Sequence, residues 1–429
     1  MNLKLTGTQT ITLTNGSTAI MTDFRPGKDT LEVKEVELFA DLTLLGSSSQ
    51  IRTTKDDIDA ILSHARRSQA DLSLTKIYVE VETDGTNYLR SEVIDGNLTT
   101  DSDFFDRVAR NHAPVRLWLK RKNYWEGGSD IQIPLTNENG TNNTTGLTVY
   151  NTNDMTGTAP TRRVNYVKML GTSITGSIPT PPKIEITNTY SNGDARLSYF
   201  WIGRAIDDAV YPLTWFLDQT MSLNTALSTE QQISLTTLTT TFLNGANGAH
   251  YRVFTKSWSA YEDLRLNAAL YFPATASLTP MQKAPEIVTG FGNSIIDLGT
   301  LQIPPWLPSM RNQTEIGLRL GGRRAGGFNV TLNDIFLFPA NAFRQLIPRG
   351  YGIATGVRLA DDGITETVWT DGWTPAGKTG HYSGYGDLIT LIPGKDQRLL
   401  FLNNTMTGGV DDAQTMSIKL YYRPRQLTP

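Results

Sequence analysis

Two stretches far apart in the chain carry the same strict alternation of apolar and polar residues. Residues 114–127 (PVRLWLKRKNYWEG) set Val115, Leu117 and Leu119 on one side and Arg116, Trp118 and Lys120 on the other. Residues 416–423 (MSIKLYYR) repeat this pattern, with Ile418, Leu420 and Tyr422 alternating with Lys419, Tyr421 and Arg423. A period of two is typical of a strand with one buried face. We therefore interpret the two stretches as parts of one domain that another domain interrupts.

The length of the chain, 429 residues, exceeds what one hydrophobic core usually holds, so two or three domains are expected. We expect residues 1–135 to form the first part of a β domain and residues 136–345 an inserted β-sandwich. Residues 346–429 would then be strands that return to the first domain. The run at 135–154 (LTNENGTNNTTGLTVYNTND) marks the boundary, because it is rich in turn formers and too polar to pack a core.

Helical patterns are confined to the first domain. Thr54, with Asp57 three residues later, predicts a capped helix start, and the apolar face that follows consists of Ile58, Ile61, Leu62 and Ala65. A second, shorter helix is predicted to begin near Thr100 or Ser102 and to carry Phe104, Phe105 and Val108 on one side. The fold class expected is mainly β, with one or two short helices on the N-terminal domain.

The central part of the chain shows strand patterns at roughly ten-residue spacing, separated by turn residues, which is typical of a β-sandwich. The predicted strands are 183–190, 196–206, 250–257, 264–272, 294–303, 316–320 and 328–338. Between residues 213 and 244 the pattern does not distinguish strand from loop. We expect a jelly-roll-like sandwich that resembles a carbohydrate-binding module.

Composition excludes several classes of site. The formal net charge of −3 and the 19% of charged residues argue against a protein that binds nucleic acid through its phosphates. There is no cysteine, and the four histidines, at positions 64, 112, 250 and 381, are far apart, so neither a zinc site nor any other metal or cofactor is expected. No stretch approaches the length of an apolar membrane span, and the N-terminus lacks the apolar core of an export signal.

One motif matches a nucleotide-binding pattern by its letters. Residues 372–379 (GWTPAGKT) fit the P-loop consensus, in which a helix must follow and hold the phosphates at its N-terminus. Here Gly380, Gly384 and Gly386 follow, and each glycine costs a helix about 1 kcal/mol relative to alanine. An ordinary glycine-rich loop is the favoured interpretation. The run at 321–327 (GGRRAGG) is likewise favoured as a turn with solvated charges over an anion-binding arginine pair.

Two further sets of residues are of the types that bind or cleave sugars. Acidic pairs at 207–208, 361–362 and 411–412 are the residue type that a glycoside hydrolase needs, but each adjoins turn residues, where aspartate is common. An aromatic set comprises Tyr199, Trp201, Trp215, Trp258, Tyr261 and Trp306. Such rings stack against sugars when exposed and build the core when buried. We keep Trp201, Trp258 and Tyr261 as candidate glycan contacts.

Three short motifs carry a family resemblance. They are KNYWEG at Lys122–Gly127, LIPGKDQRLLFL at Leu391–Leu402, and MSIKLYYRPR at Met416–Arg425. With these motifs at the two ends of an interrupted domain, the chain resembles the distal tail proteins of long-tailed bacteriophages and related tail ring and baseplate hub proteins. The resemblance covers the first 135 and the last 80 residues in architecture. The large interposed sandwich leaves open a tail tube subunit that carries an outward domain.

The resemblance implies a structural and non-enzymatic role. Subunits would assemble into a homo-oligomeric ring, a trimer or a hexamer, together with other phage tail proteins, and DNA would pass through the channel without sequence-specific binding. The protein would belong to the virion tail and assemble in the host cytoplasm. The candidate assembly residues are Arg116, Trp118, Lys120, Lys419, Tyr421 and Arg423. Open sheet edges of the first domain would be completed between protomers.

Two alternatives remain at this point. The first is a carbohydrate-binding or receptor-binding virion or surface protein without catalysis, whose partner would be a host surface glycan. The second, a glycoside hydrolase, requires two carboxylates that converge in a cleft.

Overall fold

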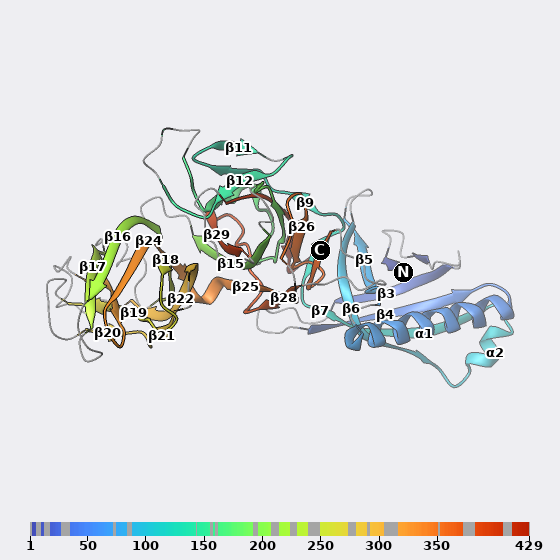
Figure 1. The fold of residues 1–429 in the computed structure, drawn as a ribbon. Coiled ribbons are helices and arrows are strands. Elements are labelled where there is room, and N and C mark those ends of the chain that lie inside the picture. The colour runs from blue at the N-terminus through green and yellow to red at the C-terminus, as the bar shows by residue number, and fades with distance from the viewer. Residues whose placement is uncertain are drawn as a thin grey trace. The chain divides into compact units, whose positions relative to one another are not determined.

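The structure is a computed structural model, and it describes most of the chain. The described residues are 2–5, 10–12, 18–26, 35–71, 74–83, 88–142, 144–154, 158, 162–191, 196–206, 214–223, 230–238, 249–272, 280–289, 292–303, 316–350, 352–371, 382–405 and 414–428. They form two compact units, Met1–Asp130 with Thr175–Thr180 and Arg423–Pro429, and Ile131–Ile174 with Pro181–Tyr422. Both units consist mainly of antiparallel sheet, which confirms the predicted fold class (Figure 1).

The first unit contains one strongly connected sheet. Its described strands are β1 (Asn2–Leu5), β2 (Thr10–Thr12), β3 (Thr18–Pro26), β4 (Glu35–Leu45), β5 (Tyr78–Glu82), β6 (Tyr88–Thr100), β7 (His112–Lys122), β8 (Trp125–Gly127) and β31 (Arg425–Gln426). Strands β1 to β7 pair in the closed order β1-β2-β3-β4-β7-β6-β5-β1, and only β1 and β5 run parallel. Strand β8 pairs with β6, and β31 pairs with β8.

Helix α1 (Ser48–Ala70) covers the apolar side of this sheet and runs alongside β4 (Figure 1). Its buried side chains, which include Ile51, Ile58 and Leu62, share a core with the apolar residues of β4 and β7. The predicted apolar face is confirmed, but the predicted start at Thr54 is wrong. Ser47 is the N-cap and forms a capping box with Gln50, because the helix begins well before Thr54.

Helix α2 (Phe104–Val108) is short, as predicted. Phe104 and Val108 are buried, whereas Phe105 is 70% exposed, so the predicted common side for all three residues is wrong for Phe105. Consecutive residues in a helix point about 100° apart, and the core takes only the pair that lies four residues apart.

The second unit contains a sandwich of two sheets. One sheet has the order β11 (Gly140–Asn142), β10 (Leu135–Asn137), β13 (Tyr166–Met169), β29 (Gln397–Thr405), β15 (Leu197–Ile206), β25 (Phe343–Pro348) and β28 (Tyr382–Tyr385). The other has the order β12 (Leu147–Tyr150), β30 (Thr415–Tyr422), β14 (Lys183–Asn188), β26 (Arg358–Asp362) and β27 (Thr367–Thr370), with β9 (Ile131–Gln132) also paired to β30. Alternate residues such as Phe200, Ile186 and Ile418 meet between the two sheets.

A second sandwich is inserted between β15 and β25 of the first. One of its sheets has the order β16 (Thr214–Leu223), β24 (Phe328–Pro339), β18 (His250–Ser259) and β22 (Gly292–Gln302). The other consists of β17 (Gln231–Thr237), β23 (Gly317–Arg323), β19 (Arg265–Tyr271) and the short strands β20 (Gln282–Lys283) and β21 (Ile287–Val288). Strands therefore occupy part of the stretch 213–244, which the sequence left undecided.

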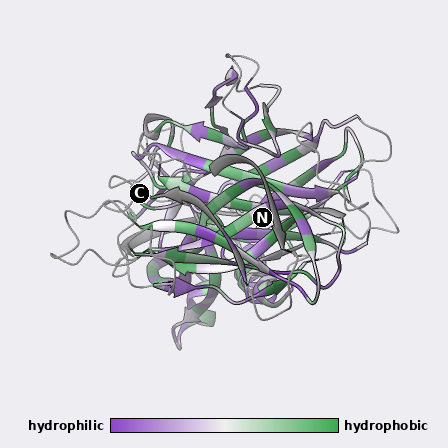
Figure 2. Cartoon of the chain, turned by 60° about the vertical axis from the view of Figure 1, so that its left-hand side comes forward, coloured by the Kyte–Doolittle hydropathy of each residue, from purple (hydrophilic) through white to green (hydrophobic). Residues whose placement is uncertain are grey.

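The core of this second sandwich continues onto the first. Phe254 and Phe338 cluster with Trp201 and Leu402, which lie on the outer side of the seven-stranded sheet. That sheet is therefore apolar on both faces over part of its area. Figure 2 shows that hydrophobic and hydrophilic residues alternate along many other strands, as expected where only one face of a sheet is buried.

The C-terminal part of the chain that belongs to the first unit is much shorter than the predicted 346–429. Strands β25 to β30 all pair within the first sandwich of the second unit, where β29 pairs with β13 and β15. Of residues 346–429, only Arg423–Pro429 rejoins the first unit, to which Thr175–Thr180 also belongs. An alternating strand fits any sheet with one apolar face, so its pattern does not reveal its neighbours.

Candidate assembly surface

The exposed side of β4 and β7 presents a set of charged and aromatic side chains. Along both strands, buried apolar residues alternate with residues that reach solvent. On β4 the outward residues are Glu35, Glu37, Phe39 and Asp41, and on β7 they are Arg116, Trp118, Lys120 and Lys122. Phe39 remains 38% exposed despite its size. We call these eight residues the β4/β7 face.

The register of the two strands sorts this face into an acidic and a basic column. Glu37 lies opposite Lys120, Phe39 opposite Trp118, and Asp41 opposite Arg116. The Arg116 Nε donates to Asp41 Oδ1 at 2.8 Å, and Lys120 forms an ion pair with Glu35. These hydrogen bonds raise the pKa values of Arg116 and Lys120. The face is thus electrically balanced, with its two aromatic rings side by side between charged rungs.

No backbone edge is available on this face. Strand β7 pairs with β4 along its whole length and with β6 on its other side. The expectation of open edges in the first domain is therefore wrong for β4, β6 and β7, because their pairing closes within one chain. Contacts with another molecule at this face must be made by side chains.

The six candidate assembly residues are divided between the two units. Arg116, Trp118 and Lys120 share the β4/β7 face, whereas Lys419 and Tyr421 lie on β30 in the second unit. The Lys183 ammonium lies 4.5 Å from the centre of the Tyr421 ring. Strand β30 is also paired on both sides, with β12 and β14. The acidic partners on β4 were missed, although their alternation with Val36, Leu38 and Ala40 was present in the sequence.

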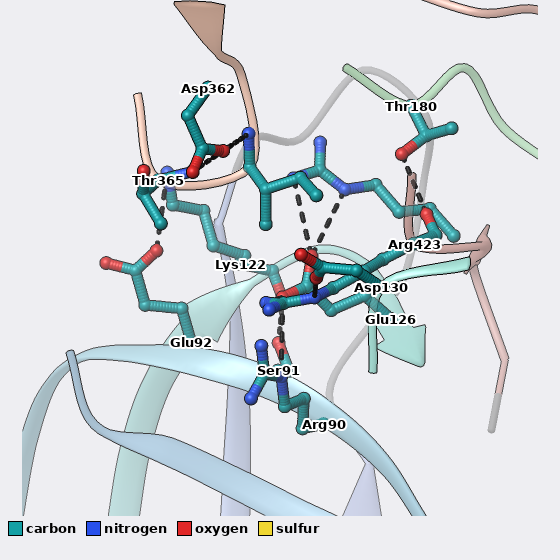
Figure 3. A network of polar contacts seen from close by, with 12 residues as sticks. Arg90, Ser91, Glu92, Lys122, Glu126, Asp130, Thr180, Asp362, Thr365 and Arg423 are labelled. Carbon is teal, nitrogen blue, oxygen red and sulfur yellow. Dashed lines mark hydrogen bonds and ion pairs between the residues drawn. The ribbon is translucent and has the colours of Figure 1, made fainter. Parts of the chain in front are cut away.

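Arg423, the last of the six, belongs to an ionic cluster around the buried carboxylate of Glu126 in the first unit (Figure 3). Its Nε donates to Asp130 Oδ1 at 2.7 Å, and its Nη1 lies 3.5 Å from Glu126 Oε1. Arg90 and Arg425 also contact the Glu126 carboxylate, at 3.5 and 3.4 Å. Burial raises the pKa of Glu126, and the arginines oppose that rise. The cluster binds the end of the chain to β8.

The three candidate glycan contacts have different environments. Trp201 is only 5% exposed and packs on Phe254, with ring centres 5.8 Å apart. The Tyr261 ring is partly buried, and the Arg324 guanidinium lies 4.1 Å from its centre. Trp258, on β18, is 43% exposed, so it alone of the three offers much ring surface. The side chains of Trp215 and Trp306 lie outside the described residues.

Of the remaining motifs, those within the described residues make hydrogen bonds or ion pairs inside the chain. The P-loop-like stretch 372–379 and the acidic pairs 207–208 and 411–412 lie outside the described residues. Asp361 accepts two hydrogen bonds of 2.9 Å from Arg344, and Asp362 accepts from the backbone amides of Ile364 and Thr365. In the glycine-rich turn, Arg323 and Arg324 pair with carboxylates of the same chain, those of Glu286 and Asp263.

The second unit contains a buried ion pair that the sequence patterns did not predict. Lys256 of β18 and Asp334 of β24 are 2% and 0% exposed, with Nζ and Oδ2 3.3 Å apart. Thr152 donates to the same Asp334 oxygen at 3.0 Å. Burial raises the pKa of Asp334 to about 6. A lysine and an aspartate far apart in the sequence gave no signal that the sheet register would bring them together.

Within the described part of the chain, no three or more acidic or histidine side chains gather as a metal-ligand group. The same residues include no helix with the length and apolar character of a membrane span.

Comparison with known proteins gives little similarity. No protein-family model matches the chain, and neither does any curated protein. Among solved structures, the VP2 subviral particle of infectious bursal disease virus has 8% identity and a TM-score of 0.18, covering 69% of this chain and 80% of that chain. The isomalto-dextranase of Arthrobacter globiformis T6, complexed with panose, has 10% identity and a TM-score of 0.15, covering 75% and 40%. Similarity at this level says nothing about what this chain does.

Proposed function

We propose that the chain is a structural subunit of a bacteriophage tail. Copies of the first unit assemble into a ring or tube around the DNA channel, and the sandwiches of the second unit are carried outside it. The subunit belongs to the virion tail, assembles in the host cytoplasm with other tail proteins, and has no catalytic role. DNA passes through the channel without sequence-specific contacts.

The observation that carries this proposal is the way in which the second unit is inserted. Asp130 and Arg423 flank the insertion, and their side chains are joined by an ion pair of 2.7 Å. The chain also returns to the first unit at Thr175–Thr180, where the Ser177 amide donates to the Arg425 carbonyl at 2.8 Å and Thr180 donates to the Arg423 carbonyl. The segments at which the chain passes between the units therefore adjoin one another in the first unit. A domain inserted at one place leaves the other surfaces of its host free for assembly. The weak likeness to VP2 is compatible with a viral structural protein, and at its TM-score it adds no support.

Electron microscopy tests the proposal directly. The purified full chain is examined by negative stain at micromolar concentration, with mass photometry to count subunits. Closed rings or stacked tubes, with trimeric or hexameric order, are the expected result. A monomer at every concentration, with no higher species on the grid, would contradict the proposal.

A second candidate, glycan binding at the second sandwich, is favoured by the exposed ring of Trp258. This ring lies opposite Thr331 on the neighbouring strand β24, and Asn329 is exposed two residues from Thr331. An aromatic ring beside amide and hydroxyl groups is a suitable surface for a sugar. Binding to a glycan array that is lost in Trp258→Ala would support it. The matched control is Tyr385→Ala, which removes a 55% exposed ring from a different sandwich.

A further inference from the structure

We propose that the β4/β7 face is an interface with a second copy of this chain, related by a two-fold axis that runs parallel to the strands. The proposal goes beyond the proposed function, because a two-fold contact joins two copies and does not by itself close a trimeric or hexameric ring. It rests on that function only because an assembling subunit meets its own copies at high concentration.

The argument begins with the symmetry of the columns. A two-fold axis parallel to the strands, midway between two facing sheets, exchanges the positions of β4 and β7 and keeps each rung at its level. Asp41 of one copy then faces Arg116 of the other, and Glu37 faces Lys120. Because every acidic position is opposite a basic position on the same rung, the face is complementary to itself.

The two-fold axis also brings the aromatic pair Phe39 and Trp118 of the two copies together. Phe39 and Trp118 occupy one level, so each Phe39 meets the Trp118 of the second copy. Facing sheets pack about 10 Å apart, a distance that side chains of this size fill. The apolar area of the 38% exposed Phe39 would be removed from water at the centre of the interface.

The ion pairs within the chain do not prevent this contact. Arg116 and Lys120 are held in place by Asp41 and Glu35, and the arginine side chain is still 67% exposed. Their positions are therefore defined before association, which lowers its entropic cost. A carboxylate has room for several donors, so each can keep its own partner and accept from the second copy.

The size of the face sets the expected affinity. Four paired positions on two strands bury about 1,000 Å² or less in total, which is at the low end of specific interfaces. We therefore expect a dimer with a dissociation constant that is roughly micromolar or weaker, and that rises with salt because the face is charged.

A charge swap provides the test. In the double variant Asp41→Arg with Arg116→Glu, the ion pair within the chain is preserved with its direction reversed. Two variant copies again present opposite charges to each other. A variant paired with a wild-type copy instead places the introduced glutamate against Asp41 and the introduced arginine against Arg116, so both contacts join like charges.

The measurement is association of labelled full chains, by energy transfer and sedimentation velocity, between about 1 and 100 µM. Wild type and the swapped variant should each self-associate similarly, and the mixed pair should bind at least about tenfold more weakly. The control swap is Lys55→Asp with Asp59→Lys, a partly exposed pair of α1 on the opposite side of the sheet. This control should mix freely with wild type.

The outcomes separate this inference from the proposed function. Equal affinity of mixed and like pairs, or no self-association at the highest concentration, would overturn the β4/β7 interface. If rings form but mixed and like pairs bind equally well, the proposed function is supported and the β4/β7 interface is refuted. If like pairs bind more tightly than mixed pairs but no rings form, the β4/β7 interface is supported and the ring is refuted.

Discussion

The surroundings of Asp334 make the stability of the protein depend on pH. The carboxylate is completely buried, and the charged or titratable groups that act on it are Lys256 and Asp154, with Thr152 as a neutral donor. Lys256 stabilises the ionised form, but burial outweighs it and raises the pKa from 3.8 to about 6. Asp334 therefore binds a proton in the folded state at pH values where the unfolded chain does not.

The sign of the pH effect follows from this difference. As the pH falls through 6 toward 4, the folded state gains a proton, so protonation of Asp334 raises the free energy of unfolding. We expect a gain of about 1 kcal/mol between pH 7 and pH 5 from this group. The measurement is urea unfolding at several pH values for wild type and Asp334→Asn.

The asparagine variant isolates Asp334 from the other carboxylates. Its stability is expected to be lower, because Lys256 loses its counter-charge in the interior. The informative quantity is the difference in the free energy of unfolding between wild type and Asp334→Asn, followed as the pH varies. A constant difference between pH 7 and pH 5 would show that Asp334 does not titrate in this range.

Among the elements, helix α1 depends on an N-terminal cap that its apolar pattern did not reveal. The Ser47 side chain accepts from the backbone of Gln50, whose side chain accepts in turn from the Ser47 amide at 2.8 Å. Ser47→Ala should lower the free energy of unfolding by about 1 kcal/mol. Thr53→Ala, at an exposed position in the same helix, is the control and should change it by less than about 0.5 kcal/mol. Urea unfolding of the two variants compares them, and equal effects would refute the cap.

Strand β31 is an element whose place depends on long-range contacts. It pairs with β8, its Arg425 contacts Glu126, and the Arg425 carbonyl accepts from the Ser177 amide at 2.8 Å. A chain that ends at Tyr422 loses all three interactions. Glu126 then keeps Arg90 as an ionic partner but loses Arg423 and Arg425. We expect faster hydrogen exchange in β8 and in Thr175–Thr180, measured by mass spectrometry.

The control for this truncation removes only residues 427–429, which lie beyond β31. Exchange in β8 should then match the full chain. Unchanged protection in the longer truncation would mean that β8 is held by β6 alone.

The whole molecule is organised as one insertion within another. The second sandwich lies between β15 and β25 of the first, and both lie between Asp130 and Arg423 of the first unit. The sandwich cores contain only residues of the second unit. Each unit therefore has the hydrophobic core that independent folding requires.

This organisation predicts that residues 131–422 fold without the first unit. Residues 175–180 would become a loop, which costs little because the closure entropy of a loop grows slowly with its length. We expect a soluble fragment with a β-type circular dichroism spectrum and a cooperative unfolding transition. A fragment that binds hydrophobic dyes and unfolds without cooperativity would contradict the division into two units.

The sequence alone determined the local features of this protein. Strands predicted at 196–206, 250–257 and 328–338 closely match β15, β18 and β24, because period-two alternation reports which face of a strand is buried. The same alternation identified Arg116, Trp118 and Lys120 as outward residues of β7. The position of a strand and the direction of its side chains depend on its own residues and on the presence of an apolar layer on one side. They do not depend on which neighbouring element provides that layer.

Only the tertiary structure decided how the strands are assembled. Backbone hydrogen bonds do not depend on which side chains a strand carries, and each cross-strand side-chain pair contributes about 1 kcal/mol or less. The neighbours of β29 and β30 therefore follow from the packing of the whole sandwich core, not from their own residues. The Asp334–Lys256 pair and the acidic and basic columns of the β4/β7 face have the same origin. They result from the register between strands, which depends on contacts between residues distant in the chain.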